Sequence, residues 1–438
     1  MTKNHFMASI ETQSIPQTLP TPSREQIGLI KLLAVCVLTP CALVSGILAL
    51  SPNFSTGTEL REEPMGGDII QEYVGGHLWI TERDKLYDWK HSASLQHDPE
   101  LIGFTWPESG YFPMVYPPFH YQFASIGSGM SYRSFVVAWM FASGLALSIA
   151  AFVFLNWYRE IRLGTGAWFF LAIFFTPLLM SLNMGQKSTI LLAILTVSFV
   201  LLHRERPFTA GLVFGLIAFK PYLAVPIGIV MLCKKQFHFV TGSLISLFAI
   251  MITSVLIAPE AWSDYIQICM GFSDYVSNGG YQLENSHSLW GSMQLMLGHL
   301  NPTLVKPFAI IAGIGVLTLV SRIMSGPIKF SSPRFAFQFA ALIIATVLVS
   351  PHFYSYDLTI LLLPLAICGL SEEVQAKINR RVMYWICIAV LFGASAYGWI
   401  ATQAGFQIST VILFVWLVVI AGGWSKLGVP KLGALKKA

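Results

Sequence analysis

Charged residues are scarce in this chain. Only 11% of its 438 residues are charged, whereas 55% are hydrophobic and the mean hydropathy is +0.63. A soluble globular domain carries roughly 25% charged residues. The composition therefore excludes a soluble protein and predicts a polytopic membrane protein. The net charge of +5 then indicates an asymmetry between the two sides of a bilayer rather than affinity for nucleic acid.

The chain also lacks the patterns typical of disulfide frameworks, metal sites and ATP-driven pumps. No CxxC spacing occurs among its six cysteines, most of which lie in or beside apolar runs: Cys36, Cys41, Cys233, Cys269, Cys368 and Cys387. No His, Asp and Glu cluster has ligand spacing, so we expect no metal. A GxxxxGK[ST] phosphate loop is missing. The polar residues 1–26 hold no signal-peptide cleavage site, so we expect the first span to be retained.

Apolar runs of membrane-spanning length recur along the chain. A helix needs about 20 residues to cross a hydrocarbon core of about 30 Å. Such runs occupy residues 27–50, 134–157, 167–183, 189–203, 240–258, 304–323, 335–349, 358–370, 383–402 and 406–424. Together with a hairpin at 208–233, they predict an all-α bundle of about 11 transmembrane helices. The expected layout is a transmembrane domain over 27–424, external loops over 51–133 and 259–303, and cytoplasmic tails over 1–26 and 425–438.

Residues 208–233 form either one long span or two half-length helices broken at Lys220-Pro221, because proline cannot continue a helix without losing a hydrogen bond. The positive-inside rule decides between them. A hairpin leaves the basic clusters on one, cytoplasmic side, whereas a single span would divide them. These clusters are Arg159 with Arg162, Arg204 with Arg206, Lys234 with Lys235, Arg322 with Lys329 and Arg334, and Lys377 with Arg380 and Arg381. We therefore expect a broken hairpin with Lys220 at its tip, in the external half of the membrane.

Four segments, in this order, resemble glycosyltransferase family 87. VYPPFHYQ is similar to a Tyr-Pro-Pro segment of the family, and residues 184–235, from MGQKSTILL to VMLCKK, resemble its central block. In that block a Gly-Gln turn, a helix, a basic-Pro turn, Ala-Gly and a late Lys-Pro follow one another. NSHSLWGSM is similar to a segment of a later external loop, and SPHFYSYDLTILLLPL to a Ser-Pro, Tyr-Asp block. The resemblance covers about residues 68–365.

This resemblance implies a membrane enzyme of the GT-C type. Such an enzyme takes a sugar from a polyprenyl-phosphate donor on the external side and passes it to a hydroxyl of a glycan or glycolipid. Similarity to bacterial envelope α-mannosyltransferases makes mannose the expected hexose, the cell membrane the expected location and both termini cytoplasmic. The resemblance implies no cofactor besides the lipid-linked donor, which is a substrate. A carrier or flippase of a lipid-linked or small substrate, or a non-catalytic scaffold, are the alternatives; the long polar loop with an acid near its start favours the enzyme.

The first external loop contains the candidate base. Inverting transfer needs a base and a cradle for the departing phosphate, which leaves without protonation. Asp68, between Gly67 and Ile69, falls where the family keeps an Asp, so the resemblance implies the base role. Glu72, four residues on and on the same face if the segment is helical, is the second candidate. The alternative role for Asp68 is that of a helix N-cap.

Candidates for binding the donor phosphate come from several turns. Lys220 is the best placed to bind the phosphate, because a lysine beside a helix break within the membrane is costly unless an anion pairs with it. The alternative is that its side chain extends to the membrane–water interface. The other candidates are Gln186, Lys187, His352 and Asp357, with Arg83 and Lys85 in the first loop. Asp357 could instead cap a helix starting at residue 358. Expected acceptor or loop contacts are Tyr116, Asn285 and His287, although the favoured interpretation of Tyr116, Tyr354 and Tyr356 is an interfacial aromatic belt rather than a sugar platform.

Overall fold

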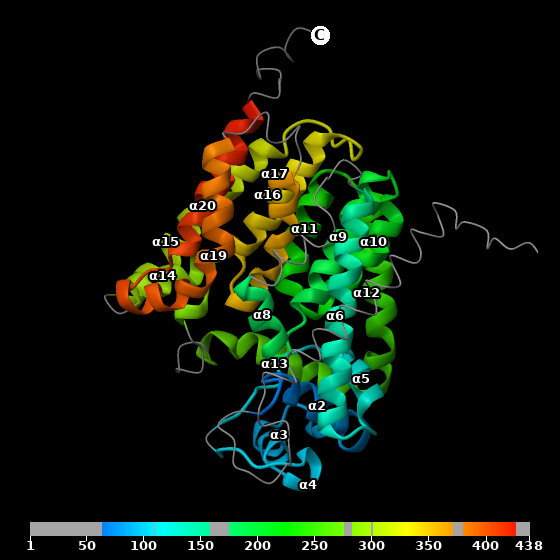
Figure 1. The fold of residues 1–438 in the computed structure, drawn as a ribbon. Coiled ribbons are helices and arrows are strands. Elements are labelled where there is room, and N and C mark those ends of the chain that lie inside the picture. Colours follow the sequence, from blue (N-terminus) through cyan, green and yellow to red (C-terminus); the bar gives the residue numbers. More distant parts are fainter. Residues whose placement is uncertain are drawn as a thin grey trace, which may run out of the picture.

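The computed structural model describes residues 64–108, 110–157, 175–275, 283–298, 301–370 and 380–425. The predicted first span at 27–50 and the tails at 1–26 and 426–438 lie outside these residues. The described residues form helices and turns, with an isolated bridge between Ser286 and Tyr354. Figure 1 shows a helical bundle above a smaller, blue and cyan part that carries α2 to α5.

The smaller part is formed by the predicted first external loop. Its helices are α2 (Ile69–Thr81), η2 (Arg83–Lys85), α3 (Trp89–Gln96), α4 (Pro99–Ile102), α5 (Pro118–Ala124) and η3 (Ser125–Gly127). They enclose a core of their own, which includes Ile70, Val74, Leu78 and Tyr121. A pair of glycines in α2 allows α5 to approach: a Cβ at Gly75 would lie 2.2 Å from the ring of Tyr121. This polar-looking loop is therefore a packed helical unit.

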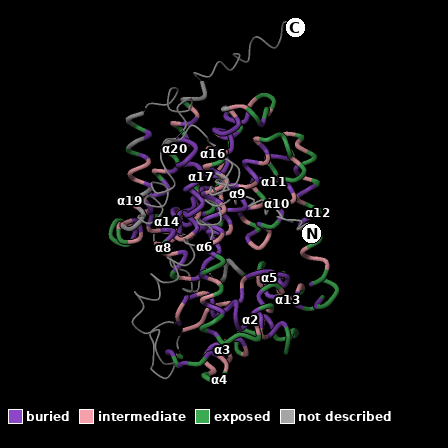
Figure 2. The backbone as a smooth tube through the Cα atoms, turned by 45° about the vertical axis from the view of Figure 1, so that its right-hand side comes forward, coloured by how far each residue is buried: buried purple, intermediate pink, exposed green. Residues whose placement is uncertain are grey.

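The bundle contains the remaining helices. They are α6 (Tyr132–Trp157), α8 (Thr176–Asn183), α9 (Ser188–His203), α10 (Pro207–Gly215), η4 (Leu216–Phe219), α11 (Pro221–Cys233), α12 (Phe237–Ile257), α13 (Pro259–Tyr275), η6 (Leu283–Asn285), α14 (Leu289–Leu297), α15 (Pro302–Ile323), α16 (Pro333–Val349), η7 (Ser355–Leu361), α17 (Leu362–Leu370), α19 (Arg380–Ala404) and α20 (Ile408–Ser425). Buried residues concentrate in α9, α16 and α17, at the centre of the bundle in Figure 2. By contrast, α12 and α15 expose most of their apolar residues.

Among the described residues, three helices are long and apolar enough to cross a membrane. They are Tyr132–Trp157, Phe237–Ile257 and Leu304–Ile323, and the pair Ala396–Ala404 and Ile408–Gly422, bent by 111°, would make a fourth. The apolar helices support a membrane protein, but the predicted count of about 11 spans is not confirmed. Several predicted spans are shorter helices. The predicted span 358–370, for example, is divided between η7 and α17.

The break predicted at Lys220 is present. Helix α10 ends at Gly215, one turn of 3-10 helix follows, and Pro221 begins α11, where its missing N–H leaves no hydrogen bond unmade. The turns before and after this hairpin lie at the same end of the bundle. Glu205 Oε1 accepts a hydrogen bond from Ser331 N (3.0 Å), and Lys234 Nζ donates one to the carbonyl of Gly326 (3.1 Å), so both turns contact the link between α15 and α16.

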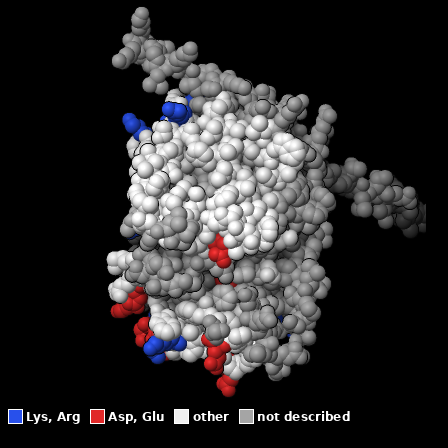
Figure 3. All heavy atoms as spheres, turned by 90° about the vertical axis from the view of Figure 1, so that its left-hand side faces the viewer, with Lys and Arg blue, Asp and Glu red and all other residues white. Residues whose placement is uncertain are grey.

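Charge is distributed to the ends of the molecule. On the face seen in Figure 3, Lys and Arg lie near the upper end, Asp and Glu lie from about mid-height to the lower end, where Lys and Arg accompany them, and an uncharged band separates the two groups. This band is what a surface in contact with lipid hydrocarbon requires.

The hairpin arrangement makes a labelling prediction. In a cysteine-free background, a cysteine at exposed Ser94 of α3 should react with a membrane-impermeant maleimide on intact cells. A cysteine at exposed Ser331 should react only after permeabilisation, because it contacts the turn that carries Arg204 and Arg206. External labelling at residue 331 would contradict the predicted orientation.

Candidate functional site

Two tight turns dock against each other and bring distant polar residues together. The backbone N–H of Asp68 donates to the carbonyl of Met184 (3.2 Å), and Trp139 Nε1 donates to the carbonyl of Gly185 (2.8 Å). Gly185 has a φ of 62°, and a Cβ there would lie 1.9 Å from Ile69 Cγ1. Only glycine tolerates both the backbone conformation and this close approach. The Gly-Gln turn therefore positions Asp68 beside Gln186.

Asp68 occupies the N-cap position of α2, but its side chain does not cap the helix. The carboxylate instead accepts a hydrogen bond from Gln186 Nε2. Gln186 is itself buried, and its Oε1 accepts a hydrogen bond from the hydroxyl of Tyr116 (3.4 Å). The side chain of Asp68 is thus directed away from the helix end and toward the bundle, with an uncharged amide as its hydrogen-bond partner.

Burial raises the pKa of Asp68 from its ordinary 3.8 to about 7. Lys187 and Lys220 act against this rise by attracting the carboxylate, whereas Glu72 adds to it by repulsion. A carboxyl group with a pKa near neutrality can accept a proton and release it again at physiological pH, as general base catalysis requires.

Glu72 lies one turn further along α2 in a different environment. It is 1% exposed, forms an ion pair with Lys187 and is hydrogen-bonded to the imidazole of His120. The ammonium of Lys187 also lies 3.3 Å from the ring centroid of Tyr116. Burial alone would raise the pKa of Glu72, but His120 and Lys187 outweigh it and lower the pKa to about 2. Glu72 is therefore an ionised anchor for the ammonium of Lys187 and the imidazole of His120, which makes it a poor proton acceptor.

A second buried ion pair joins Lys220 to Asp357 at 2.5 Å. Two hydroxyl groups also donate to the carboxylate, from Ser188 (2.9 Å) and Tyr222 (3.3 Å). Lys220 is 2% exposed and Asp357 is fully buried. Lys220 therefore does not extend to an interface, and Asp357, inside η7, does not cap a helix that begins at residue 358. The anion that we expected a substrate to supply to Lys220 is provided by the chain itself.

The two ion pairs lie next to each other, because consecutive residues contact their carboxylates. Lys187 contacts Glu72, and Ser188 contacts Asp357. Lys187 and Lys220 both lie close enough to Asp68 to lower its pKa. Side chains from α2, α5, the turn before α9, the hairpin tip and η7 thus meet at one place, between the smaller part and the bundle (Figure 1).

Three further aromatic residues adjoin the two lysines or their partners. His352 packs its ring against Tyr222 (5.5 Å between centroids), beside the Lys220 pair. Tyr116 and Tyr356 present their rings to the two lysines, Tyr356 at 5.3 Å from Lys220 Nζ. These two rings lie inside the cluster, although a belt position was the interpretation that we favoured from sequence.

The second loop is attached through His287. Its Nδ1 pairs with Ser409 Oγ (2.6 Å) and its Nε2 with Ser355 Oγ (2.7 Å), so this histidine connects η7 to α20. Burial lowers the pKa of His287 to about 3, so it stays neutral. Asn285 ends η6 two residues earlier. His287 thus helps to position the segment that carries Asp357.

Arg83 and Lys85 lie in η2, beyond the far end of α2. The 13 residues of α2, at a rise of about 1.5 Å per residue, separate Arg83 from Asp68 by roughly 20 Å. Lys85 pairs with Glu82 on the surface. Neither residue belongs to the cluster.

Sequence reasoning missed His120, Ser188 and Tyr222. Each interacts with a carboxylate far along the chain, at separations of 48, 169 and 135 residues. Local patterns cannot reveal such partners. Among the described residues, no three His, Cys, Asp or Glu side chains could hold a metal ion together.

The buried pair of Glu72 and Lys187 makes a stability prediction. Replacing Glu72 by Gln should destabilise the protein by about 3–5 kcal/mol, because it leaves buried Lys187 without a counter-charge. The double variant Glu72→Gln/Lys187→Gln should recover most of that loss. Thermal unfolding of the purified protein in detergent measures both.

A matched control is Glu82→Gln, which breaks an exposed pair with Lys85 and should change stability little. Wild-type stability of Glu72→Gln would show that the pair does not hold α2 against the bundle.

The comparisons with known proteins agree with the geometry. The family model of glycosyltransferase family 87 matches residues 114–351, more than half of the chain. The matched range includes Tyr116, His120, Gln186, Lys187 and Lys220, whereas Asp68, Glu72 and Asp357 lie outside it. No curated protein matches the chain. With its apolar helices and this family match, the chain belongs to glycosyltransferase family 87 and is a membrane glycosyltransferase.

Proposed function

We propose that the protein transfers a hexose from a polyprenyl-phosphate donor to an acceptor hydroxyl on the external face of the membrane. The transfer inverts the anomeric carbon, and resemblance to family members makes mannose the proposed hexose. One observation supports this most: Asp68, with a pKa near 7, lies within electrostatic reach of two buried lysines. A base and a cationic cradle on opposite sides of a sugar are what inverting transfer requires.

Asp68 acts as the general base in this proposal. As the acceptor oxygen attacks the anomeric carbon, its proton moves to a carboxylate oxygen of Asp68. The bond from the anomeric carbon to the phosphate oxygen breaks, and its electron pair leaves with the phosphate. Gln186 holds the carboxylate in place as an amide donor and leaves its basicity near neutral pH. Glu72, already ionised and paired, anchors the site.

Lys220 and Lys187 stabilise the departing phosphate. An ammonium has three N–H donors, and Asp357 accepts one from Lys220 at 2.5 Å. The remaining donors can bind phosphate oxygens. Asp357 thus holds Lys220 in position before the donor arrives, which avoids reorganisation during the reaction. Lys187, held by Glu72 and the ring of Tyr116, adds positive charge on the same side.

The base role predicts a specific response to Asp68→Asn. This variant keeps the size and the hydrogen-bonding capacity of the side chain but cannot accept the proton. The protein should accumulate in the membrane while sugar transfer falls by about 10² to 10⁴, the usual contribution of general base catalysis. Transfer is measured with a radiolabelled polyprenyl-phosphate hexose and equal amounts of protein.

The same role fixes the pH dependence. Asp68 must be deprotonated to act, so kcat/KM of the wild type should rise with pH and level off above about 7. Glu108→Gln, which changes an exposed carboxylate of the same loop, should show the same dependence of kcat/KM on pH as the wild type. Near-normal transfer by Asp68→Asn would end the base assignment.

Lys220 is tested together with its partner. Lys220→Met should reduce transfer about ten- to a hundred-fold, the effect of losing a hydrogen bond to a charged group. Because this change leaves Asp357 buried without its cation, accumulation of the protein should fall too.

The double variant Lys220→Met/Asp357→Asn separates the two effects. It should restore accumulation and leave transfer low. Lys234→Met, which removes an ammonium from the opposite end of α11, serves as the control. Recovery of transfer in the double variant would show that Lys220 serves the fold alone.

A further inference from the structure

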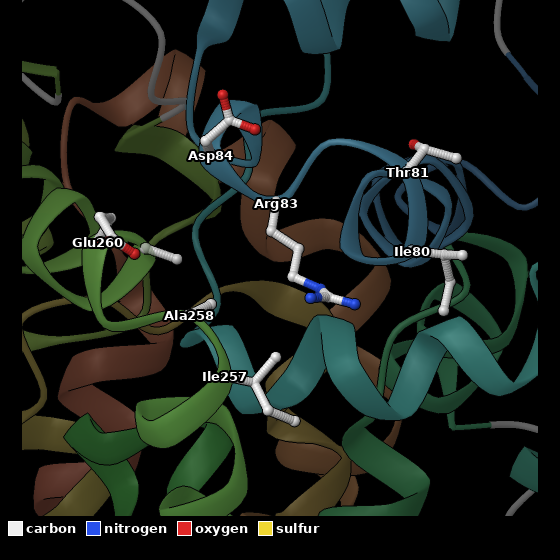
Figure 4. Close-up of a pocket in the computed structure, with 8 residues that line it drawn as sticks. Ile80, Thr81, Arg83, Asp84, Ile257, Ala258 and Glu260 are labelled. Carbon is white, nitrogen blue, oxygen red and sulfur yellow. The ribbon is translucent and has the colours of Figure 1, made fainter.

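A separate cavity lies where the end of α2 and η2 meet the corner between α12 and α13 (Figure 4). Its volume is about 290 Å³. Ile80 and Ile257 form apolar walls, and Arg83, Asp84 and Glu260 contribute charged groups. None of the residues of the Asp68 cluster lines it. Its combination of apolar and charged walls suits an amphiphilic ligand.

Arg83 of η2 is held in this cavity by the last turn of α2. Its Nε donates to the carbonyl of Trp79 (2.6 Å), and its guanidinium lies 5.7 Å from the Trp79 ring centroid. In Figure 4 the side chain extends into the space between Ile80 and Ile257. No carboxylate in the described part of the chain forms an ion pair with Arg83, so its terminal nitrogens remain available for an anion. A fixed guanidinium is well suited to bind a phosphate through two hydrogen bonds.

The cavity lies at the end of a helix that is long and apolar enough to span a membrane. Helix α12, one of the three helices apolar and long enough to span a membrane, ends at Ile257. Its last turn exposes Leu256 (74%) and Ile257 (47%), and Ile80 across the cavity is 56% exposed. Large exposed apolar residues at the end of a membrane span contact acyl chains near the headgroups. The charged groups of the cavity follow directly after this apolar boundary.

Two carboxylates accompany the single cation. Asp84 and Glu260 line the same cavity, and neither has an ion-pair partner among the residues that the structure describes. A headgroup with a net negative charge would meet two anions and one cation. A headgroup that combines a phosphate with a primary ammonium would match both signs, since an ammonium has three N–H donors for carboxylates.

We propose that this cavity binds a bilayer phospholipid with a phosphoethanolamine headgroup. Its phosphate contacts Arg83, its ammonium contacts Glu260, and its acyl chains follow Ile257 and Ile80. The site is distinct from the site of sugar transfer, which lies roughly 20 Å away along α2. A lipid held here connects the smaller part to the corner between α12 and α13.

Native mass spectrometry of the full-length protein released from detergent tests the proposal. The probes are phosphatidylethanolamine, phosphatidylcholine and phosphatidylglycerol with identical acyl chains. Phosphatidylethanolamine should bind best, because phosphatidylcholine lacks N–H donors and phosphatidylglycerol lacks the cation. Arg83→Gln should weaken its binding about tenfold or more, as the loss of a charge-assisted hydrogen bond does.

Glu260→Gln should reduce the preference for phosphatidylethanolamine over phosphatidylglycerol, while retaining binding through Arg83. Lys90→Gln, which removes an exposed cation of α3, should bind as the wild type does. Because Arg83, Glu260 and Lys90 are all exposed, these variants should elute as the wild type does in size-exclusion chromatography. Equal binding of the three lipids, or unchanged phosphatidylethanolamine binding by Arg83→Gln, would overturn the proposal.

Discussion

The cost of burying charge organises this structure. An ammonium or carboxylate removed from water loses several kcal/mol of solvation unless a counter-charge and further hydrogen bonds replace the water. Lys187 and Lys220 are each about 2% exposed, and each is paired with one buried carboxylate. The pair of Glu72 and Lys187 holds α2 against the turn before α9. The pair of Lys220 and Asp357 holds the hairpin tip against η7. Charge pairing thus determines how four distant segments meet.

Three carboxylates in one cluster have different properties because their partners differ. Glu72 and Asp357 each have a lysine as a partner, whereas Asp68 has the neutral amide of Gln186. Burial therefore raises the pKa of Asp68, while the cations keep Glu72 ionised. Such a separation of acidities between neighbouring carboxyl groups assigns them different roles in enzymes generally. It supports Asp68 as the base and the other two as anchors, in a protein whose family favours an enzyme over a carrier.

Much of the architecture could be predicted locally. The apolar run 189–203 corresponds to α9, and the runs 240–258 and 304–323 correspond to α12 and α15, each within a few residues. The break at Lys220-Pro221 follows from proline chemistry, and the position of both flanking turns at one end agrees with the distribution of basic residues. The number of spans was harder to predict, because a short helix such as α17 is buried by its neighbours, whereas hydropathy treats it as a helix that faces lipid.

The sequence by itself determined the membrane class, the family resemblance, the helix break and the set of polar residues from which the site is built. Apolar periodicity, proline geometry and residue order along the chain carry that information directly. Only the tertiary structure decided which carboxylate meets which cation. Asp68 and Gln186 are 118 residues apart, Glu72 and Lys187 are 115 apart, and Lys220 and Asp357 are 137 apart. Ionic attraction and desolvation depend on distance in space, and at such separations the fold alone sets that distance.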